Sequence, residues 1–284
     1  MRLDMMALNP DGFADIIDYI DLLLYNRPIP HREYDQIYMR AKHMLKQVTY
    51  VQELLMGKRI AFLGDGDGMS LLLALLSQRY HLGIDSMTVF DFDDRILTAF
   101  KSVSKDYQLQ IPTTYELYNV IDPISPNHKG RFDFFYINPP YGSKNYGLSC
   151  IMWLMRCMEL STADAEGCII IPNDTRFPWV QSCMENITRF LLSSGFQILQ
   201  TLSNIHEYHL SDNPELQSSM LHVKRISDCQ SPYTGSRFPL SMCANLYGST
   251  RAIPRYIYAS PSNPYGDPDF NWEYGHIDNF PVTK

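Results

Sequence analysis

Residues 60–70 of this 284-residue chain read Ile60-Ala61-Phe62-Leu63-Gly64-Asp65-Gly66-Asp67-Gly68-Met69-Ser70, and this stretch decides the fold. A short apolar run enters a glycine-rich loop, and an apolar helical pattern begins directly after the loop. This order of strand, loop and helix is typical of nucleoside-binding α/β proteins, because glycines let the backbone approach a ligand closely. The two acidic side chains of the loop would repel the phosphates of a dinucleotide. The loop therefore favours a cationic ligand such as a sulfonium or an amine.

Short apolar runs alternate with longer amphipathic stretches beyond this loop. Strands are expected at residues 59–63, 87–91, 115–120, 132–137 and 168–171, and helices at 69–79, 95–105, 148–160 and 180–192. This alternation is the βαβ rhythm of a parallel sheet. Residues 196–202 and 218–223 are expected to close the sheet as an antiparallel terminal pair. The sequence thus predicts an α/β, Rossmann-like fold with a mostly parallel sheet.

Three segments are expected along the chain. Residues 1–56 carry apolar positions at helical spacing and predict an N-terminal helical segment. Residues 57–226 are expected to form the Rossmann-like nucleoside-binding catalytic domain. Residues 227–284 are rich in Pro, Tyr, Ser, Asn and Gly, which predicts a loop-rich C-terminal extension. We expect this extension to pack on the body, because a disordered tail would contain fewer aromatics than Tyr247, Tyr256, Tyr258, Phe270, Trp272 and Tyr274.

The bulk composition is that of an ordinary globular protein, with 45% hydrophobic and 19% charged residues. A net charge of −7 argues against a nucleic-acid partner, since binding many phosphates needs clustered Lys and Arg. No apolar run is long enough to span a membrane, and the six cysteines stand singly like reduced thiols. These features predict a cytoplasmic protein, and they leave open a homodimer or a larger assembly.

Acidic residues follow the predicted second and third strands. Asp91 ends the second strand, where ribose hydroxyls are bound in folds of this kind. Asp93 is a candidate for the same site, or alternatively the cap of the following helix. Asp122 is placed to accept a hydrogen bond from an adenine amine, or alternatively to form a turn before Pro123. The predicted nucleoside-binding set is Gly64, Gly66, Asp91, Asp93 and Asp122.

The predicted strand at residues 132–137 ends in Asn138-Pro139-Pro140-Tyr141, which resembles the amine-acceptor motif of amino methyltransferases. Two prolines stiffen the loop, the Asn138 carbonyl accepts hydrogen bonds from an amine, and Tyr141 stacks on the target. The predicted catalytic residues are Asp65, Asp67, Asn138 and Tyr141.

A late segment, residues 204–209, gathers titratable groups after a predicted strand. Glu207 is expected to face a cationic substrate, with a polar hairpin end as the alternative. His206, Glu207 and His209 lack a further ligand at a familiar spacing, so no metal site is predicted. The predicted substrate-binding residues are Pro139, Pro140, Glu207 and Tyr208.

Five short motifs together resemble the branched-chain polyamine synthases, also called bis(aminopropyl)spermidine synthases, across roughly residues 34–223. They are Tyr34-Asp35-Gln36, Leu63-Gly64-Asp65-Gly66-Asp67, Asp91-Phe92-Asp93-Asp94-Arg95, Pro139-Pro140 and Ile205-His206-Glu207-Tyr208. The resemblance implies a class I methyltransferase-like fold and transfer of an aminopropyl group from decarboxylated S-adenosylmethionine to a polyamine. It also implies that the loop aspartates and Glu207 hold the polycation. Gly66 departs from the family, which has an acid there.

Three functions are therefore weighed. The first is aminopropyl transfer, in which an amine deprotonated by Asp65 or Asp67 attacks the carbon beside the sulfonium. The second is an S-adenosylmethionine-dependent amino methyltransferase that uses Asn138 to Tyr141 on a nucleobase or small amine. The third is a scaffold that keeps the fold without the chemistry, with which Gly66 and the aromatic tail are compatible.

Overall fold

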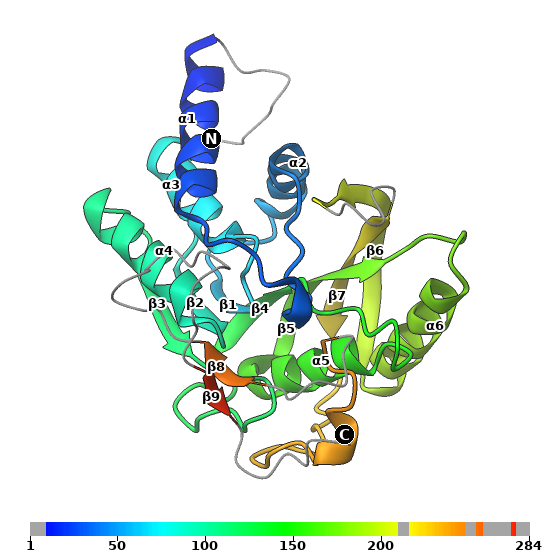
Figure 1. The fold of residues 1–284 in the computed structure, drawn as a ribbon. Helices are drawn as coiled ribbons and strands as arrows, with labels where there is room; N and C mark the ends of the chain where they lie inside the picture. The colour runs from blue at the N-terminus through cyan, green and yellow to red at the C-terminus, as the bar shows by residue number, and fades with distance from the viewer. Residues whose placement is uncertain (1–9, 210–215, 248–253, 258–273, 277–284) are drawn as a thin grey trace.

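A seven-stranded sheet lies at the centre of the fold, in the strand order β3-β2-β1-β4-β5-β7-β6 (Figure 1). The computed structural model describes residues 10–209, 216–247, 254–257 and 274–276. The strands are β1 (Arg59–Leu63), β2 (Ser86–Asp91), β3 (Thr113–Leu117), β4 (Phe132–Ile137), β5 (Ser161–Pro172), β6 (Phe196–Glu207) and β7 (Gln217–Arg225). A separate pair is formed by β8 (Pro254–Ile257) and β9 (Tyr274–His276).

Strands β1 to β5 run parallel, and β7 is antiparallel to both β5 and β6. This order and this inserted antiparallel strand are those of the class I methyltransferases. The predicted fold class is therefore confirmed, including the antiparallel pair at the end of the sheet.

Six α-helices and two short 3-10 helices accompany the sheet in the described part of the chain. They are α1 (Pro10–Asn26), α2 (Ala41–Val51), α3 (Met69–Tyr80), α4 (Asp94–Asp106), α5 (Leu148–Leu160), α6 (Pro178–Ser193), η1 (Arg32–Tyr34) and η2 (Leu240–Met242). Successive residues of a strand face opposite sides, so β1 contributes to two cores. Ile60 and Phe62 pack with α1 to α4, whereas Ala61 and Leu63 pack with α5 and α6.

Three strands differ most from the predicted ranges. β5 begins at Ser161 rather than at residue 168. β3 ends at Leu117 rather than at residue 120, because Asn119 forms a turn in which its side chain accepts a hydrogen bond from Ile121 N at 3.0 Å. β6 continues to Glu207, so the late segment forms part of the strand. A register shift lies between Leu202 and His206, where Asn204 has a left-handed conformation (φ 54°). The shift lets the strand resume pairing at His206 with Ser218.

The segment between α1 and α2 crosses the carboxyl edge of the sheet (Figure 1). Its backbone pairs with the end of β6: Arg40 N donates to Glu207 O at 3.0 Å, and His209 N donates to Tyr38 O at 2.9 Å. Inside the segment, the Tyr38 hydroxyl donates to Pro28 O at 2.8 Å. These bonds hold the segment over the strand ends.

A fully buried arginine joins α5 to residues 233–238. Arg156 donates to four backbone carbonyls, two at residues 120–121 and two at Tyr233 and Ser236, at 2.9–3.2 Å. It also pairs with Glu159, and its guanidinium lies 4.0 Å from the centre of the Phe238 ring. The first part of the predicted C-terminal extension therefore contacts the body, and Tyr258, Phe270 and Trp272 lie outside the described residues.

Within the described residues, no helix combines the length and apolarity that crossing a membrane requires.

Candidate functional site

The site lies at the carboxyl ends of three adjacent strands, β2, β1 and β4. Strand order reverses between β1 and β4, and ligands of open α/β sheets bind at such a switch point. The glycine loop (residues 64–68) follows β1, and the Asn138–Tyr141 loop follows β4. Asn138 Nδ2 donates to Asp67 Oδ2 at 2.6 Å, so the two loops are in direct contact.

Asp65 holds the glycine loop in shape by capping α3. Its carboxylate accepts hydrogen bonds from Met69 N at 2.8 Å, from Ser70 N at 3.1 Å and from the Ser70 hydroxyl. Carboxylates stabilise a helix start because they satisfy free backbone N–H groups. Burial raises the pKa of Asp65 to about 7.

Asp91, at the end of β2, binds backbone N–H groups on both sides of the site. Its carboxylate oxygens accept from Asp65 N at 2.9 Å and from Asp93 N at 3.0 Å. Burial, reinforced by the nearby Asp93, raises the pKa of Asp91 to about 7. Asp91, the residue predicted to bind ribose hydroxyls, lines the pocket, and these hydrogen bonds fix its position.

Asp67 connects three parts of the chain. One oxygen accepts from Met39 N at 2.6 Å, and the other accepts from the Asn138 amide. Burial raises the pKa of Asp67. Arg27 reaches the same loop residue at its backbone carbonyl, with Nη1 donating at 3.1 Å.

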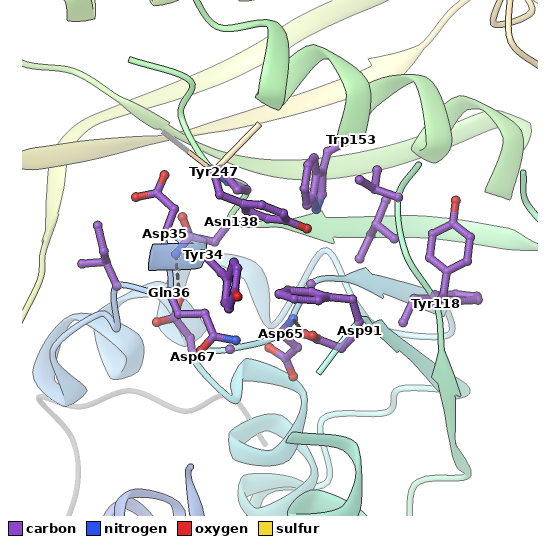
Figure 2. A pocket seen from close by; sticks show the side chains of 18 of the residues that line it. Tyr34, Asp35, Gln36, Asp65, Asp67, Asp91, Tyr118, Asn138, Trp153 and Tyr247 are labelled. Atoms are coloured by element: carbon purple, nitrogen blue, oxygen red, sulfur yellow. Dashed lines mark hydrogen bonds between the residues drawn. The ribbon is translucent and has the colours of Figure 1, made fainter. Parts of the chain in front are cut away.

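The first pocket contains a group of aromatic side chains drawn from four separate segments (Figure 2). Phe92 and Tyr247 stack with ring centres 5.4 Å apart. Tyr34 meets both rings edge-on, and Trp153 meets Tyr247 edge-on at 6.2 Å. Such rings suit an adenine, a sulfonium or both, since aromatic faces attract cations and stack on bases.

Carboxylates alone supply the formal charge among the residues that line this first pocket in the described part of the chain. Asp35, Asp65, Asp67 and Asp91 line it, and none of its lining residues is Lys, Arg or His. This arrangement favours a cationic ligand and disfavours an anionic one.

A second pocket adjoins the first and is lined by the loop after β4. Its lining residues are Arg32, Asp35, Ile37, Asn138, Pro139, Pro140, Tyr141, Ser143, Trp179, Tyr208 and Leu216. Asp35, Ile37, Asn138 and Pro140 line both pockets. The two pockets therefore meet at these four residues, where a group could pass from one ligand to another.

Hydroxyl groups under the second pocket form a short chain. The Tyr141 hydroxyl bonds to that of Tyr208 at 2.6 Å, and Tyr208 bonds to the Ser218 hydroxyl at 2.7 Å. His206 continues the chain from Ser218 to Gln47, with both ring nitrogens engaged at 2.9 and 2.7 Å. Burial lowers the pKa of His206 to about 3, so this histidine stays neutral.

Most of the residues predicted from the sequence line one of the two pockets. Gly64, Asp65, Gly66, Asp67 and Asp91 line the first, Pro139, Tyr141 and Tyr208 line the second, and Asn138 and Pro140 line both.

Three predicted residues lie elsewhere. Asp93 caps α4 and pairs with Arg95 at 2.5 Å, as the capping alternative expected. Asp122 pairs with Arg237 at 2.9 Å. The Glu207 carboxylate lies 3.4–3.7 Å from Arg40, Lys42 and His43, in a surface hollow beside β6. None of the three is among the residues that line the two pockets.

Sequence reasoning did not assign several lining residues to the site. Asp35 belongs to the Tyr34-Asp35-Gln36 motif, so the resemblance carried a signal for it. Trp153 lies in the apolar helix α5 and has the pattern of a core residue. Tyr247 comes from the loop-rich C-terminal part, whose contact with the site no local pattern predicts.

No group of three His, Cys, Asp or Glu side chains is arranged to hold a metal ion in the part of the chain that the structure describes.

Comparison with known proteins identifies the family. Residues 15–245 match the family model described as "Branched-chain polyamine synthase A C-terminal domain". The chain belongs to this family. The branched-chain polyamine synthase family is one of transferases, in agreement with the class of enzyme predicted from the sequence.

Two curated relatives come from Methanocaldococcus jannaschii. An uncharacterized protein is 24% identical over 234 residues, 78% of this chain and 55% of that protein. The N(4)-bis(aminopropyl)spermidine synthase is 24% identical over 133 residues, 45% of this chain and 36% of that enzyme. The chain thus spans about half of the first relative and about a third of the second.

A solved structure supports the fold. The branched-chain polyamine synthase of Thermus thermophilus has a TM-score of 0.65 and 19% identity, over 80% of this chain and 67% of that enzyme. That enzyme was crystallised with N4-aminopropylspermidine and 5'-methylthioadenosine.

Proposed function

We propose that this branched-chain polyamine synthase relative transfers an aminopropyl group from decarboxylated S-adenosylmethionine to an amine of a polyamine. The observation that carries the proposal is the first pocket, with four lining carboxylates and no lining Lys, Arg or His in the described part of the chain. The Thermus thermophilus enzyme has a polyamine and a methylthio-nucleoside bound. These are the same classes of molecule as the proposed acceptor and the nucleoside that the proposed donor leaves behind.

The charge of the first pocket favours the decarboxylated donor over S-adenosylmethionine. Both molecules carry a sulfonium, but S-adenosylmethionine adds a carboxylate that needs a cationic partner or a set of donors. Four lining carboxylates would oppose that group. The decarboxylated donor keeps the sulfonium and the ammonium but has no carboxylate, so its two positive charges suit the same pocket.

The second pocket has the features of a polyamine site. A polyamine is a chain of methylenes with amines at intervals, so it needs apolar walls and a few acceptors. Ile37, Trp179 and Leu216 supply apolar surface, and Pro139 and Pro140 stiffen one wall. The side-chain oxygen of Asn138 accepts a hydrogen bond from an amine while its Nδ2 donates to Asp67.

Each residue at the site then has a stated role. Asp91 holds the ribose hydroxyls, Asp65 fixes the glycine loop, and Asp67 orients Asn138. Tyr141 and Tyr208 face the acceptor. The bound donor supplies an electrophilic carbon beside its sulfonium.

The six cysteines of the protein are free thiols, which supports a reducing compartment, the cytoplasm.

Donor preference in binding tests the proposal. Isothermal titration of the purified protein with decarboxylated S-adenosylmethionine and with S-adenosylmethionine is expected to show at least about tenfold tighter binding of the decarboxylated form, which corresponds to about 1.4 kcal/mol. Equal binding, or tighter binding of S-adenosylmethionine, would contradict it.

One observation favours an amino methyltransferase as a second candidate. The Asn138–Tyr141 loop lies where the two pockets meet, as an amine-methylating loop would. Transfer of a labelled methyl group to a nucleobase or small amine, with no aminopropyl product, would establish this second function.

A further inference from the structure

The carboxylates that line the first pocket differ in what they already bind. Asp65 accepts three hydrogen bonds from the start of α3, and Asp91 accepts two from backbone N–H groups. Asp67 accepts one on each oxygen, from Met39 N and from Asn138. Each of these hydrogen bonds occupies a lone-pair site and favours the charged form of the carboxylate, so these three are less suited to accept a proton than a carboxylate that makes no hydrogen bond.

Asp35 is the exception. Among the described residues its carboxylate makes no hydrogen bond and no ion pair, and yet it lines both pockets. Its backbone has a left-handed conformation (φ 59°), and its N–H donates to Arg32 O at 3.2 Å. The turn therefore fixes the residue where the pockets meet. In Figure 2 the Asp35 carboxylate stands apart from Asp65, Asp67 and Asp91.

We propose that Asp35 is the catalytic residue that binds the acceptor amine where the two pockets meet and takes its proton. This inference rests on the proposed aminopropyl transfer. It replaces the glycine-loop aspartates as the base and leaves them to shape the donor site.

The proposed step conserves atoms and charge. A protonated amine of the acceptor gives one proton to the Asp35 carboxylate. The nitrogen lone pair then forms a bond to the donor carbon beside the sulfonium, and the carbon–sulfur bond breaks with its electron pair going to sulfur. The products are the alkylated ammonium and a neutral thioether nucleoside.

The surroundings of Asp35 suit a base. Burial raises the pKa of Asp35, and the Arg32 guanidinium opposes this effect. A higher pKa makes the carboxylate a better match for an amine, whose own pKa is about 10. Arg32 itself lines the second pocket, and Asp65, Asp67 and Asp91 line the first. The remaining titratable side chains that line the two pockets are tyrosines.

Asp35→Asn tests the inference, because it keeps the shape and removes the base. Turnover at about pH 7 is expected to fall by about 100-fold or more. The loss is expected to shrink as the pH approaches about 10, where free amine is present without a base. Binding of 5'-methylthioadenosine should be unchanged. Asp35→Glu should recover part of the turnover.

Asp164→Asn is the matched control, because it removes the same charge at an exposed position on β5 away from both pockets. Its turnover should equal that of the wild type. Two results would overturn the role of Asp35 alone: turnover in Asp35→Asn like that of the wild type, or a loss that is the same at every pH. Absence of any aminopropyl product from the wild type would instead overturn the proposed function and this inference together.

Discussion

The Asn138 amide donates a hydrogen bond of 2.6 Å to Asp67, which joins the loop after β4 to the glycine loop after β1. The second Asp67 oxygen accepts from Met39 N, in the segment that crosses the strand ends. A single buried carboxylate thus connects the walls of both pockets. Rigid connection of this kind matters because group transfer requires the two reactants to be held in a fixed relation.

Replacing Asn138 by Ala is expected to weaken turnover more than donor binding. The change removes the side-chain oxygen that accepts a hydrogen bond from the substrate amine, and it leaves the buried Asp67 oxygen without its hydrogen-bond donor. The expected loss is about 1.5–3 kcal/mol, or roughly 10- to 150-fold in kcat/KM for the polyamine. Steady-state kinetics together with titration of 5'-methylthioadenosine measures both effects. Asn127→Ala, at an exposed turn, is the control. Weaker binding of 5'-methylthioadenosine by Asn138→Ala, with kcat/KM for the polyamine unchanged, would contradict the role given to this residue.

Gly68→Ala is expected to destabilise the fold strongly. Gly68 has φ +78°, and a Cβ there would lie 2.6 Å from Leu23 Cδ1 and 2.9 Å from Phe100 Cζ. Gly57→Ala isolates the backbone effect, because Gly57 has φ +66° and a Cβ there would meet no atom within 4 Å. Urea unfolding should show a loss of about 1–2 kcal/mol for Gly57→Ala, the usual cost of a left-handed residue. Gly68→Ala should lose about 1–3 kcal/mol more from overpacking, and equal losses in the two variants would contradict the role given to packing.

Stability should fall as the pH rises toward neutrality. The carboxyl of Asp91 has a folded-state pKa of about 7 and a reference value of 3.8, so between these values the folded state binds more protons than the unfolded state. The free energy of unfolding therefore decreases as the pH rises through this window. Asp65 acts in the same direction.

Asp91→Asn measures this effect, because the amide does not titrate. Between about pH 4.5 and pH 7.5 the wild type is expected to lose more stability than the variant by at least about 1 kcal/mol, since each pKa unit is worth about 1.4 kcal/mol. Asp106→Asn, at the exposed end of α4, should follow the wild type. The same pH slope in Asp91→Asn and wild type would show that Asp91 does not cause the effect.

The fold was predictable because its local signals agree. The strands β1 and β4 have the predicted bounds, since each is an apolar run that ends at a Gly or at Asn-Pro. The extension of β6 was not predictable, because it depends on the left-handed Asn204 that lets pairing resume after a register shift.

The site was predictable where residues follow strand ends, as Asp65, Asp67, Asp91 and Asn138 do. The same pattern holds for Asp93, Asp122 and Glu207. Each of these carboxylates forms an ion pair with an arginine instead and lines neither pocket. Asp35 and Tyr247 reach the site from segments without a strand-end pattern. Tertiary contact, rather than local sequence, places them there.

The most direct test of the central claim is product analysis with the purified chain. The protein is incubated with a polyamine mixture and either decarboxylated S-adenosylmethionine or S-adenosylmethionine, and the products are identified by mass spectrometry. Aminopropyl addition from the decarboxylated donor, with no methylated polyamine from the other, is the expected result. Methyl addition alone, or no product from either donor while the nucleoside binds, would contradict aminopropyl transfer.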